Sequence, residues 1–288
     1  MVSKHLVLKG HSAPIYAVTS DQNFIYSSSG DKIVTRWNKI SGEQDSFVVR
    51  LDEPAYSISI YEELLLVGTT KGTVYAINTS NKSVVWERNL FGFPIFSIEI
   101  NSSLKQIYVG DAEGNLIVFN SSGDKLISLP LNSGKIRVLL SNGNQLYVGS
   151  NSGKLIVLDE LTFNQINQID LEIGISCFFI NEKDNSCHIG LKNAHLFSIQ
   201  LQNGQILKKL PLHHQTIYGI ELFGSILVTV SMDKTMKFWE RDTFNPLKRI
   251  ELKDGGHSRS INGIHKLNEC EFVTFSDDKT LILWQLTK

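Results

Sequence analysis

Histidine, serine and aspartate recur along this chain at spacings that could support nucleophilic chemistry. In one stretch His213 precedes Ser231 and Asp233, and the same residue types return later in the chain. A base, a hydroxyl and an acid are the parts of a hydrolytic triad. Here, however, the set ends on a tryptophan and occurs in three copies, whereas a nucleophilic site is built once. We therefore interpret these residues as a repeated structural network, with the members His11, Asp31 and Trp37; His213, Ser231, Asp233 and Trp239; and His257, Ser276, Asp278 and Trp284.

The physical basis of such a network is that buried imidazole and indole groups need hydrogen-bond partners. An indole N–H can only donate, and leaving it or a buried imidazole nitrogen unpaired costs about 1–3 kcal/mol. A chain of hydrogen bonds from aspartate through histidine and a strand hydroxyl, expected to be Ser231 or Ser276, would satisfy the tryptophan as well. We therefore expect the members of a set to be kept or lost together.

The three sets belong to a longer repeat with a spacing of 39 to 45 residues. Each of the seven copies contains short apolar runs cut by turn residues, and no segment keeps a helical period. A repeat of this length with four strands is typical of a propeller blade. The sequence predicts an all-β fold, a seven-bladed β-propeller of four-stranded antiparallel blades, in a single domain over residues 1–288. The copies are aligned on Trp37, Ile77, Phe119, Leu158, Ile199, Trp239 and Trp284.

The seven copies also test the network internally. The three copies with histidine are the three with aspartate and with tryptophan. In the other four copies apolar residues replace both histidine and tryptophan, so apolar packing is expected to replace the whole set. The residues in the histidine column of these copies are Leu51, Phe91, Leu131 and Leu171.

Copies 1, 6 and 7 resemble the WD-repeat family. The pair Gly10 and His11 followed by SGDKIVTRWN matches the signature of that family, and SMDKTMKFWE and SDDKTLILWQ repeat it. The aspartate that ends the signature is replaced by Asn38, Glu240 and Gln285. Copies 2 to 5 depart further, and VGTTKGTVYAIN resembles the repeat of quinoprotein-like propellers. The turns of copies 2, 3 and 4 contain Gly72, Gly114 and Gly153, and glycine accepts the positive φ of a tight hairpin.

The first and last segments of the chain are expected to pair. The last copy ends at its third strand, and an unassigned strand occupies residues 4–10. This N-terminal strand is predicted to complete the last blade as its outer strand, which would close the ring of blades and cover an exposed sheet edge.

The resemblance to WD-repeat proteins also indicates where a partner would bind. In that family the residue five places after the histidine column surrounds the mouth of the central channel, where peptides dock. Aromatic side chains there supply flat contact area and can accept an extended peptide or a cation. We therefore expect a partner-binding set, with Lys135 nearby, although the rings could instead only fill the channel. The set comprises Tyr16, Tyr56, Phe96, Ile136, Arg137, Ser176, Tyr218 and Asn262.

Charge and cysteine content exclude other classes of function. The 28 basic and 29 acidic residues nearly balance, so neither nucleic acid nor a membrane is an expected partner. Three cysteines without a CxxC pair indicate free thiols and a cytoplasmic protein. Trp86 is expected on the outer strand of blade 2, where it would cover the neighbouring blade.

The predicted function is that of a non-catalytic scaffold that binds a partner protein or peptide. No catalytic, cofactor-binding or metal-binding residues are predicted, because the phosphate-loop, zinc and serine-hydrolase motifs do not occur. The alternative is a propeller enzyme, quinoprotein-like or hydrolytic, or a small-molecule binder that uses the same channel.

Overall fold

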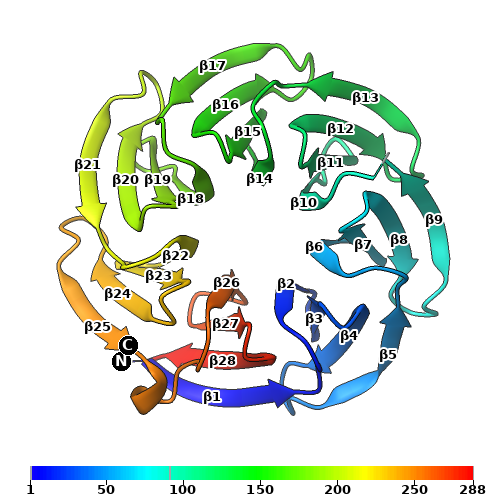
Figure 1. Cartoon of the computed structure of the whole chain (residues 1–288), viewed down its shortest axis with the longest axis horizontal. Coiled ribbons are helices and arrows are strands. Elements are labelled where there is room, and N and C mark those ends of the chain that lie inside the picture. The colour runs from blue at the N-terminus through cyan, green and yellow to red at the C-terminus, as the bar shows by residue number, and fades with distance from the viewer. Residues whose placement is uncertain (1, 91, 288) are drawn as a thin grey trace. The chain divides into compact units, whose positions relative to one another are not determined.

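Seven four-stranded sheets make up almost all of the protein (Figure 1). The computed structural model describes residues 2–90 and 92–287 of the chain. Six sheets take their strands in chain order, and the seventh is assembled from both ends of the chain. The pairings between neighbouring strands are antiparallel, as in β6 with β7 and β7 with β8. The predicted all-β fold with seven four-stranded blades is therefore confirmed.

The strands have similar lengths, as expected for copies of one unit. The first sheets comprise β2 (Ile15–Ser20), β3 (Phe24–Ser29), β4 (Ile33–Asn38) and β5 (Gln44–Arg50); β6 (Ala55–Tyr61), β7 (Leu64–Thr69), β8 (Thr73–Asn78) and β9 (Val84–Asn89); β10 (Ile95–Asn101), β11 (Gln106–Asp111), β12 (Asn115–Asn120) and β13 (Lys125–Pro130); and β14 (Ile136–Asn142), β15 (Gln145–Ser150), β16 (Lys154–Asp159) and β17 (Gln165–Asp170). The remaining sheets comprise β18 (Ile175–Asn181), β19 (Ser186–Leu191), β20 (His195–Gln200) and β21 (Ile206–Pro211); β22 (Ile217–Phe223), β23 (Ile226–Ser231), β24 (Met236–Glu240) and β25 (Pro246–Ile250); and β26 (Ile261–Lys266), β27 (Glu271–Ser276), β28 (Thr280–Leu286) and β1 (Val2–Lys9). A short 3₁₀ helix, η1, spans Leu252–Asp254.

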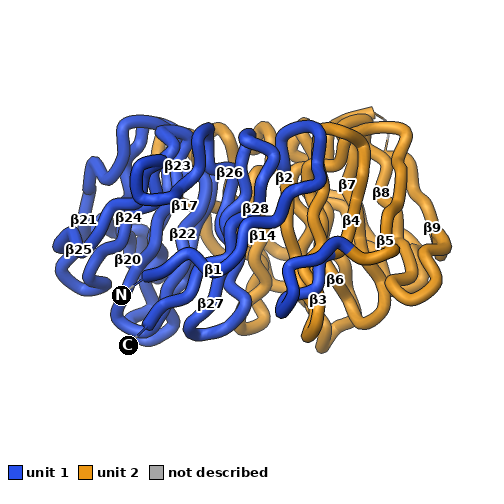
Figure 2. Tube along the Cα trace, turned by 90° about the horizontal axis from the view of Figure 1, so that it is seen from below, with its two compact units in different colours: residues 1–16, 37–44, 176–288 blue, residues 17–36, 45–175 orange. Residues whose placement is uncertain are grey.

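The chain divides into two compact units, coloured in Figure 2. Unit 1 contains residues 1–16, 37–44 and 176–288, and unit 2 contains residues 17–36 and 45–175. Unit 2 therefore holds the complete sheets of blades 2, 3 and 4, each of which contributes side chains to the site described below.

The N-terminal strand completes the last blade, as predicted. Strand β1 pairs antiparallel with β28, so that Val7 faces Ile282, and a bulge lies between Lys4 and Leu6. Because β1 covers the outer edge of β28, the backbone groups of that edge are paired within the fold.

Buried faces explain why the inner strands read as apolar runs. In unit 2, Leu66, Val74, Ile95, Val109 and Ile117 belong to one core cluster that joins blades 2 and 3. A strand that is covered on both faces loses the alternation of apolar and polar residues. The outer strands keep more exposed side chains, and β13 alternates between exposed and half-buried positions.

Turns between the second and third strands contain a residue with positive φ. In blades 2, 3 and 4 this residue is the predicted glycine, and Gly72 has a φ of 84°. In blades 6 and 7 it is a lysine, and Lys234 and Lys279 have φ values of 70° and 71°. The aspartate before each lysine accepts a hydrogen bond from the backbone N–H of the residue that follows the lysine. In blade 6 the Thr235 N–H donates to Asp233 Oδ1 at 3.0 Å. This bond stabilises a backbone conformation with positive φ, which is unfavourable for residues other than glycine.

Candidate functional site

A continuous chain of hydrogen bonds joins the tryptophan, histidine and aspartate of blade 6. The Trp239 indole N–H donates to Thr229 Oγ1 at 2.9 Å, and this hydroxyl lies 2.8 Å from His213 Nε2. His213 Nδ1 lies 3.0 Å from Asp233 Oδ2. Because an indole only donates and a carboxylate only accepts, the Thr229 hydroxyl must donate to Nε2, and the Nδ1–H must donate to Asp233.

Blade 7 repeats this arrangement with the same atoms. Trp284 Nε1 donates to Thr274 Oγ1 at 2.9 Å, His257 Nε2 lies 2.9 Å from Thr274 Oγ1, and Nδ1 lies 2.9 Å from Asp278 Oδ2. In blade 1 the rings of His11 and Trp37 meet edge to face, with centroids 6.1 Å apart. Blades 6 and 7 thus place histidine, aspartate and tryptophan in the same arrangement, which agrees with the interpretation of these residues as a structural set.

The linking hydroxyl differs from the prediction. Ser231 and Ser276 were expected to join histidine to tryptophan, but threonines two residues earlier do so. Ser231 instead donates to the carbonyl of Gln215 and accepts the backbone N–H of Asp233, both at 3.0 Å. Ser276 accepts the N–H of Asp278 in the same way. The serines lie where β23 and β27 end, so they stabilise the turn rather than the buried chain of hydrogen bonds.

A sequence signal for the threonines exists but needs the strand register. The residue at this place in the second strand is Thr229 in blade 6 and Thr274 in blade 7, and Ser27 in blade 1. In the blades without histidine the equivalent residue is apolar. Those residues are Val67, Val109, Val148 and Ile189. A fourth column therefore follows the same division as histidine, aspartate and tryptophan.

Electrostatics agree with a neutral histidine beside an ionised carboxylate. Burial lowers the pKa of His213, although Asp233 opposes this effect. Burial alone would raise the pKa of Asp233, but hydrogen bonds from His213, His214 and Thr235 outweigh it and hold that pKa well below its usual range. Thr229 and His213 are both buried, and the Thr229 hydroxyl also accepts the Trp239 indole N–H, so the arrangement favours a structural role over a nucleophilic one.

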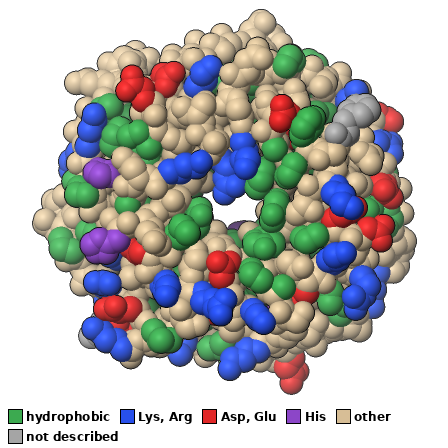
Figure 3. Space-filling view, viewed as in Figure 1, with side chains coloured by type: hydrophobic (Ala, Val, Ile, Leu, Met, Phe, Trp, Pro, Cys, Tyr) green, Lys and Arg blue, Asp and Glu red, His purple; other side chains and the backbone are tan. Residues whose placement is uncertain are grey.

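A cluster of two aromatic rings and two cations lies at the start of three successive first strands in unit 2. Tyr56 of β6 stacks on Phe96 of β10, with ring centroids 5.1 Å apart and an interplanar angle of 11°. Lys135 Nζ lies 4.4 Å and Arg137 Cζ 4.8 Å from the centroid of the Phe96 ring. Figure 3 shows hydrophobic side chains over β6 and β10, with Lys or Arg side chains beside them over β14. We call these four residues the Phe96 cluster.

Strand alternation explains why both cations reach the same ring. Lys135 and Arg137 flank Ile136, and alternate residues of a strand point to opposite faces. Ile136 is fully buried in the core of blades 3 and 4, unlike the expectation that it would meet a partner. It corresponds to the buried residues Ala55 and Ile95 at the starts of β6 and β10. The residue of blade 4 that corresponds to Tyr56 and Phe96 is therefore Arg137.

The predicted residues of unit 1 have other contacts. Ser176 is buried, and its hydroxyl lies 2.8 Å from the carbonyl of Gly190 and 2.5 Å from that of Ile217. Asn262 Nδ2 donates to the carbonyl of Ile15 at 2.9 Å and to Asp277 Oδ1 at 2.7 Å. Both side chains therefore tie backbone segments together.

The two tyrosines of this column in unit 1 are half-buried. The Tyr218 hydroxyl lies 3.9 Å from the sulfur of Met232. The role of these residues in partner binding stays a prediction.

Trp86 covers the neighbouring blade, as expected. Its indole N–H donates to the carbonyl of Ser121 at 3.1 Å, and its ring lies 5.9 Å from that of Phe119. Gly123 lies against the indole so closely that a Cβ atom there would be 2.6 Å from it. This tryptophan is therefore part of the packing between blades 2 and 3.

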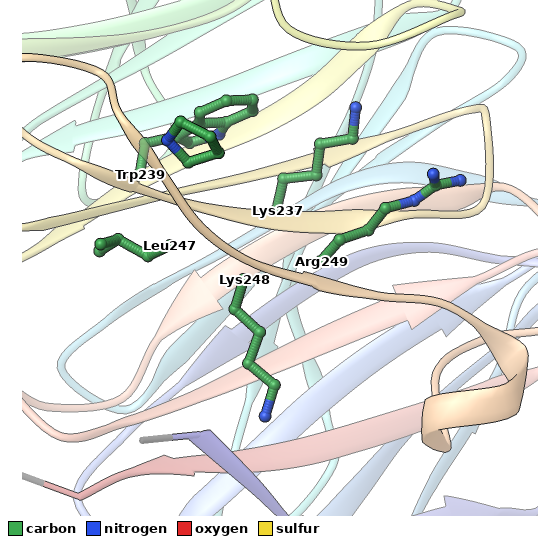
Figure 4. Close-up of a pocket in the computed structure, with 6 residues that line it drawn as sticks. Lys237, Trp239, Leu247, Lys248 and Arg249 are labelled. Atoms are coloured by element: carbon green, nitrogen blue, oxygen red, sulfur yellow. The ribbon is translucent and has the colours of Figure 1, made fainter.

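A hollow of about 280 Å³ lies beside Trp239 on β24 and β25. In Figure 4 the side chains of Lys237 and Arg249 extend toward one side and that of Lys248 toward the other. Each cation already has a partner: Lys237 Nζ donates to the carbonyl of Leu212, Lys248 Nζ to that of Val2, and Arg249 pairs with Glu251. Because the three cations have partners in the protein and the Trp239 indole N–H is bonded to Thr229, this hollow is not favoured as a ligand site.

Residues with metal-binding side chains do not converge in the described structure. Within residues 2–90 and 92–287, no three histidine, cysteine, aspartate or glutamate side chains are placed to hold a metal ion. The three cysteines are free thiols. None of the helices in the same part of the chain has the length and apolar content needed to cross a membrane.

Two family models match the chain. The model described as WD domain, G-beta repeat, matches residues 3–38, which contain the first histidine and tryptophan set. The model described as ER membrane protein complex subunit 1, second beta-propeller, matches residues 60–242. The second match begins in blade 2 and includes copies 2 to 5, which lack the histidine and tryptophan set. One of these copies contains the segment VGTTKGTVYAIN, which resembles the repeat of quinoprotein-like propellers.

Curated relatives match at low identity and are longer than this chain. Actin-interacting protein 1 of Drosophila melanogaster is 23% identical over 288 residues, which cover 97% of this chain and 40% of that protein. The WD repeat-containing protein 55 homolog of Drosophila erecta is 30% identical over 96 residues, which cover 33% of this chain and 19% of that protein. Kinesin-like protein KIF21B of Mus musculus is 22% identical over 262 residues, 84% of this chain and 14% of that protein.

A solved structure supports the fold. The crystal structure of the computationally designed Ika8 protein matches with a TM-score of 0.77 and 15% identity, over 98% of this chain and 99% of that one. At that identity the likeness concerns the fold alone. Together with the family model that spans more than half of the sequence, these findings identify the chain as a WD-repeat β-propeller that belongs to the family of the second β-propeller of ER membrane protein complex subunit 1.

Proposed function

We propose that this propeller is a non-catalytic interaction scaffold and that a partner protein binds at the Phe96 cluster. The observation that carries the proposal is the stack of Tyr56 on Phe96 with two cations on the same ring. Both rings are half-buried, so part of each remains accessible to a partner. Aromatic and arginine side chains contribute most to the binding energy of protein interfaces.

Position in the fold supports the same function. The cluster is assembled from loops and strand starts of three sheets whose cores are closely packed, so its residues are held by rigid elements. A preorganised surface loses little conformational entropy when a partner binds. One relative, Actin-interacting protein 1, is named as a protein that binds another protein, and we extend only this general property to the present chain.

The test is site-specific photo-crosslinking in cells that produce the protein. A photoreactive amino acid at position 56 is expected to crosslink a discrete partner, because Tyr56 lies at the edge of the cluster. The same amino acid at position 84 is the control, since Val84 is an exposed apolar residue of the outer strand β9. Identical crosslinked species from both positions, or none from position 56, would reject the Phe96 cluster as the binding surface.

A second arm uses variants with loss of apolar surface. Tyr56→Ser with Phe96→Ser is expected to abolish capture, in a pull-down from the same cells, of the partner identified by crosslinking at position 56. Val84→Ser with Val85→Ser removes exposed apolar surface elsewhere and is expected to leave that partner in place. We also propose that the protein acts in a reducing compartment such as the cytoplasm, because its three cysteines are free thiols.

A further inference from the structure

The Lys135 ammonium has an unusual set of neighbours. Its closest recorded contacts are the Phe96 ring at 4.4 Å and the charge of Arg137, which approaches the same ring. Burial lowers the pKa of Lys135, and the positive charge of Arg137 lowers it further. Two like charges are thus held beside one ring, and each disfavours the charged form of the other.

Other lysines at this end of the sheets have partners of their own. Lys71 Nζ lies 3.6 Å from Glu53 Oε1, and Lys154 Nζ donates to the carbonyl of Asn132 at 3.1 Å. Within the residues that the structure describes, neither a hydrogen bond nor an ion pair is recorded for the Lys135 ammonium. Lys71 and Lys154 thus each have one polar partner in the protein, and among the described residues the Lys135 ammonium has none.

Tyr56 provides the apolar side of the cluster, with a half-buried ring that is stacked on Phe96. A ligand with only negative charge would leave these rings in water. A ligand that joins a negative group to an apolar one would cover the rings and pair the cations at the same time.

We propose that the partner of the Phe96 cluster is an acidic protein segment, which places an aspartate or glutamate carboxylate at Lys135 and Arg137 and an adjacent apolar side chain against Tyr56. This inference rests on the proposed function, because it names the chemistry of the partner at the same surface. Phe96 is then a positioning residue that holds both cations on its ring and directs them at one carboxylate.

The experiment is selection of short random peptides displayed on phage against the whole purified chain, followed by affinity measurement on synthetic copies. Selected peptides are expected to be enriched in aspartate or glutamate beside an apolar residue. Lys135→Ala with Arg137→Ala should weaken their binding by at least about tenfold, since a hydrogen bond to a charged group contributes roughly 1.5–3 kcal/mol. Replacing the peptide carboxylate with its amide should have the same effect.

The matched control removes two other lysines from the same end of the sheets. Lys71→Ala with Lys154→Ala lowers the net charge equally and is expected to change affinity by less than about threefold, because surface charges contribute little at moderate salt. Charge reversal by Lys135→Glu with Arg137→Glu is expected to select basic peptides in place of acidic ones.

Three results would overturn the inference. Peptides whose binding depends on Tyr56 and Phe96 but not on Lys135 and Arg137 would refute the acidic partner and leave the proposed function in place. Selected peptides insensitive to all four positions would refute both. Tighter binding of a phosphoserine peptide, a single-stranded RNA or a phosphatidylserine vesicle than of the carboxylate peptides would assign the cations to a different ligand.

Discussion

Replacing Thr229 with valine removes the hydroxyl at the centre of the blade 6 network and changes the side-chain volume little. The hydroxyl is fully buried, accepts the Trp239 indole N–H and donates to His213 Nε2. The variant leaves an indole donor and an imidazole acceptor unpaired inside the protein. Each unpaired group costs about 1–3 kcal/mol, and the added methyl group recovers roughly 1 kcal/mol by apolar burial. We expect a loss of about 3 kcal/mol in the free energy of unfolding.

The assay is urea denaturation followed by far-UV circular dichroism, with the free energy extrapolated to water. Ser231→Ala is the comparison, because Ser231 was the linking hydroxyl expected from the sequence. Ser231 is also buried, but its partners Gln215 and Asp233 are an exposed and a half-buried residue of the turns, so loss of its hydroxyl should cost only about 1 kcal/mol. A Thr229→Val variant no less stable than Ser231→Ala would refute the assignment of the linking hydroxyl.

Two further variants separate the network from simple packing. In a double-mutant cycle, Thr229→Val and Trp239→Phe should couple by about 1 kcal/mol or more, because each removes one end of the same hydrogen bond. Val148→Thr puts a hydroxyl at the equivalent place in blade 4, where histidine and tryptophan are missing. It should destabilise by about 1–3 kcal/mol. Additive changes in the free energy of unfolding in the cycle would show that Thr229 and Trp239 do not share a hydrogen bond. An unchanged free energy of unfolding for Val148→Thr would show that a buried hydroxyl needs no partner at this place.

Three other perturbations probe charge and backbone conformation. Burial, opposed by a hydrogen bond from the Ser141 N–H, raises the pKa of Glu99 to about 7. The raised pKa means that the contribution of Glu99 to stability is complete below about pH 4.5, where Glu99 is protonated, and is lost as the pH rises through 7. In melting experiments Glu99→Gln should therefore be as stable as the parent at about pH 4.5. At about pH 8 it should be more stable by up to about 3 kcal/mol. Asp233 and Asp278 have lowered pKa values, so their contribution is complete above about pH 4 and is lost below it; changing both to asparagine should lower stability at neutral pH and flatten its decline in acid titrations. Lys279→Gly should raise the free energy of unfolding by up to about 1 kcal/mol, since φ is 71° at this residue, and a decrease would show that the lysine side chain stabilises the turn.

Repetition made much of the fold predictable. Because the sequence contains seven copies of one unit, equivalent positions in the copies could be compared with one another. That comparison identified His213, Asp233 and Trp239 as residues that occur together. The pairing of β1 with β28 followed from a strand left over at one end and a strand missing at the other. Both conclusions depend on local pattern and counting, which a linear sequence contains.

Register was the information that the sequence left open. A strand displaced by one residue exchanges its buried and exposed faces. Counting from the histidine column placed Ile136 at the binding surface, whereas an extra residue before β14 puts Ile136 in the core and Arg137 on the surface. The sequence also could not decide between Thr229 and Ser231 as the linking hydroxyl. Both are hydroxyl residues of β23, and because they are two residues apart they point to the same face of the strand.

By itself the sequence determined the number of blades, the class of fold and the residues that occur as a set, because these properties are periodic along the chain. Only the tertiary structure decided that Tyr56, Phe96, Lys135 and Arg137 meet at one ring, although about 80 residues of chain separate the first from the last. Contacts between neighbouring sheets depend on the stagger of strands and the directions of side chains, and neither quantity has a period that the linear sequence records.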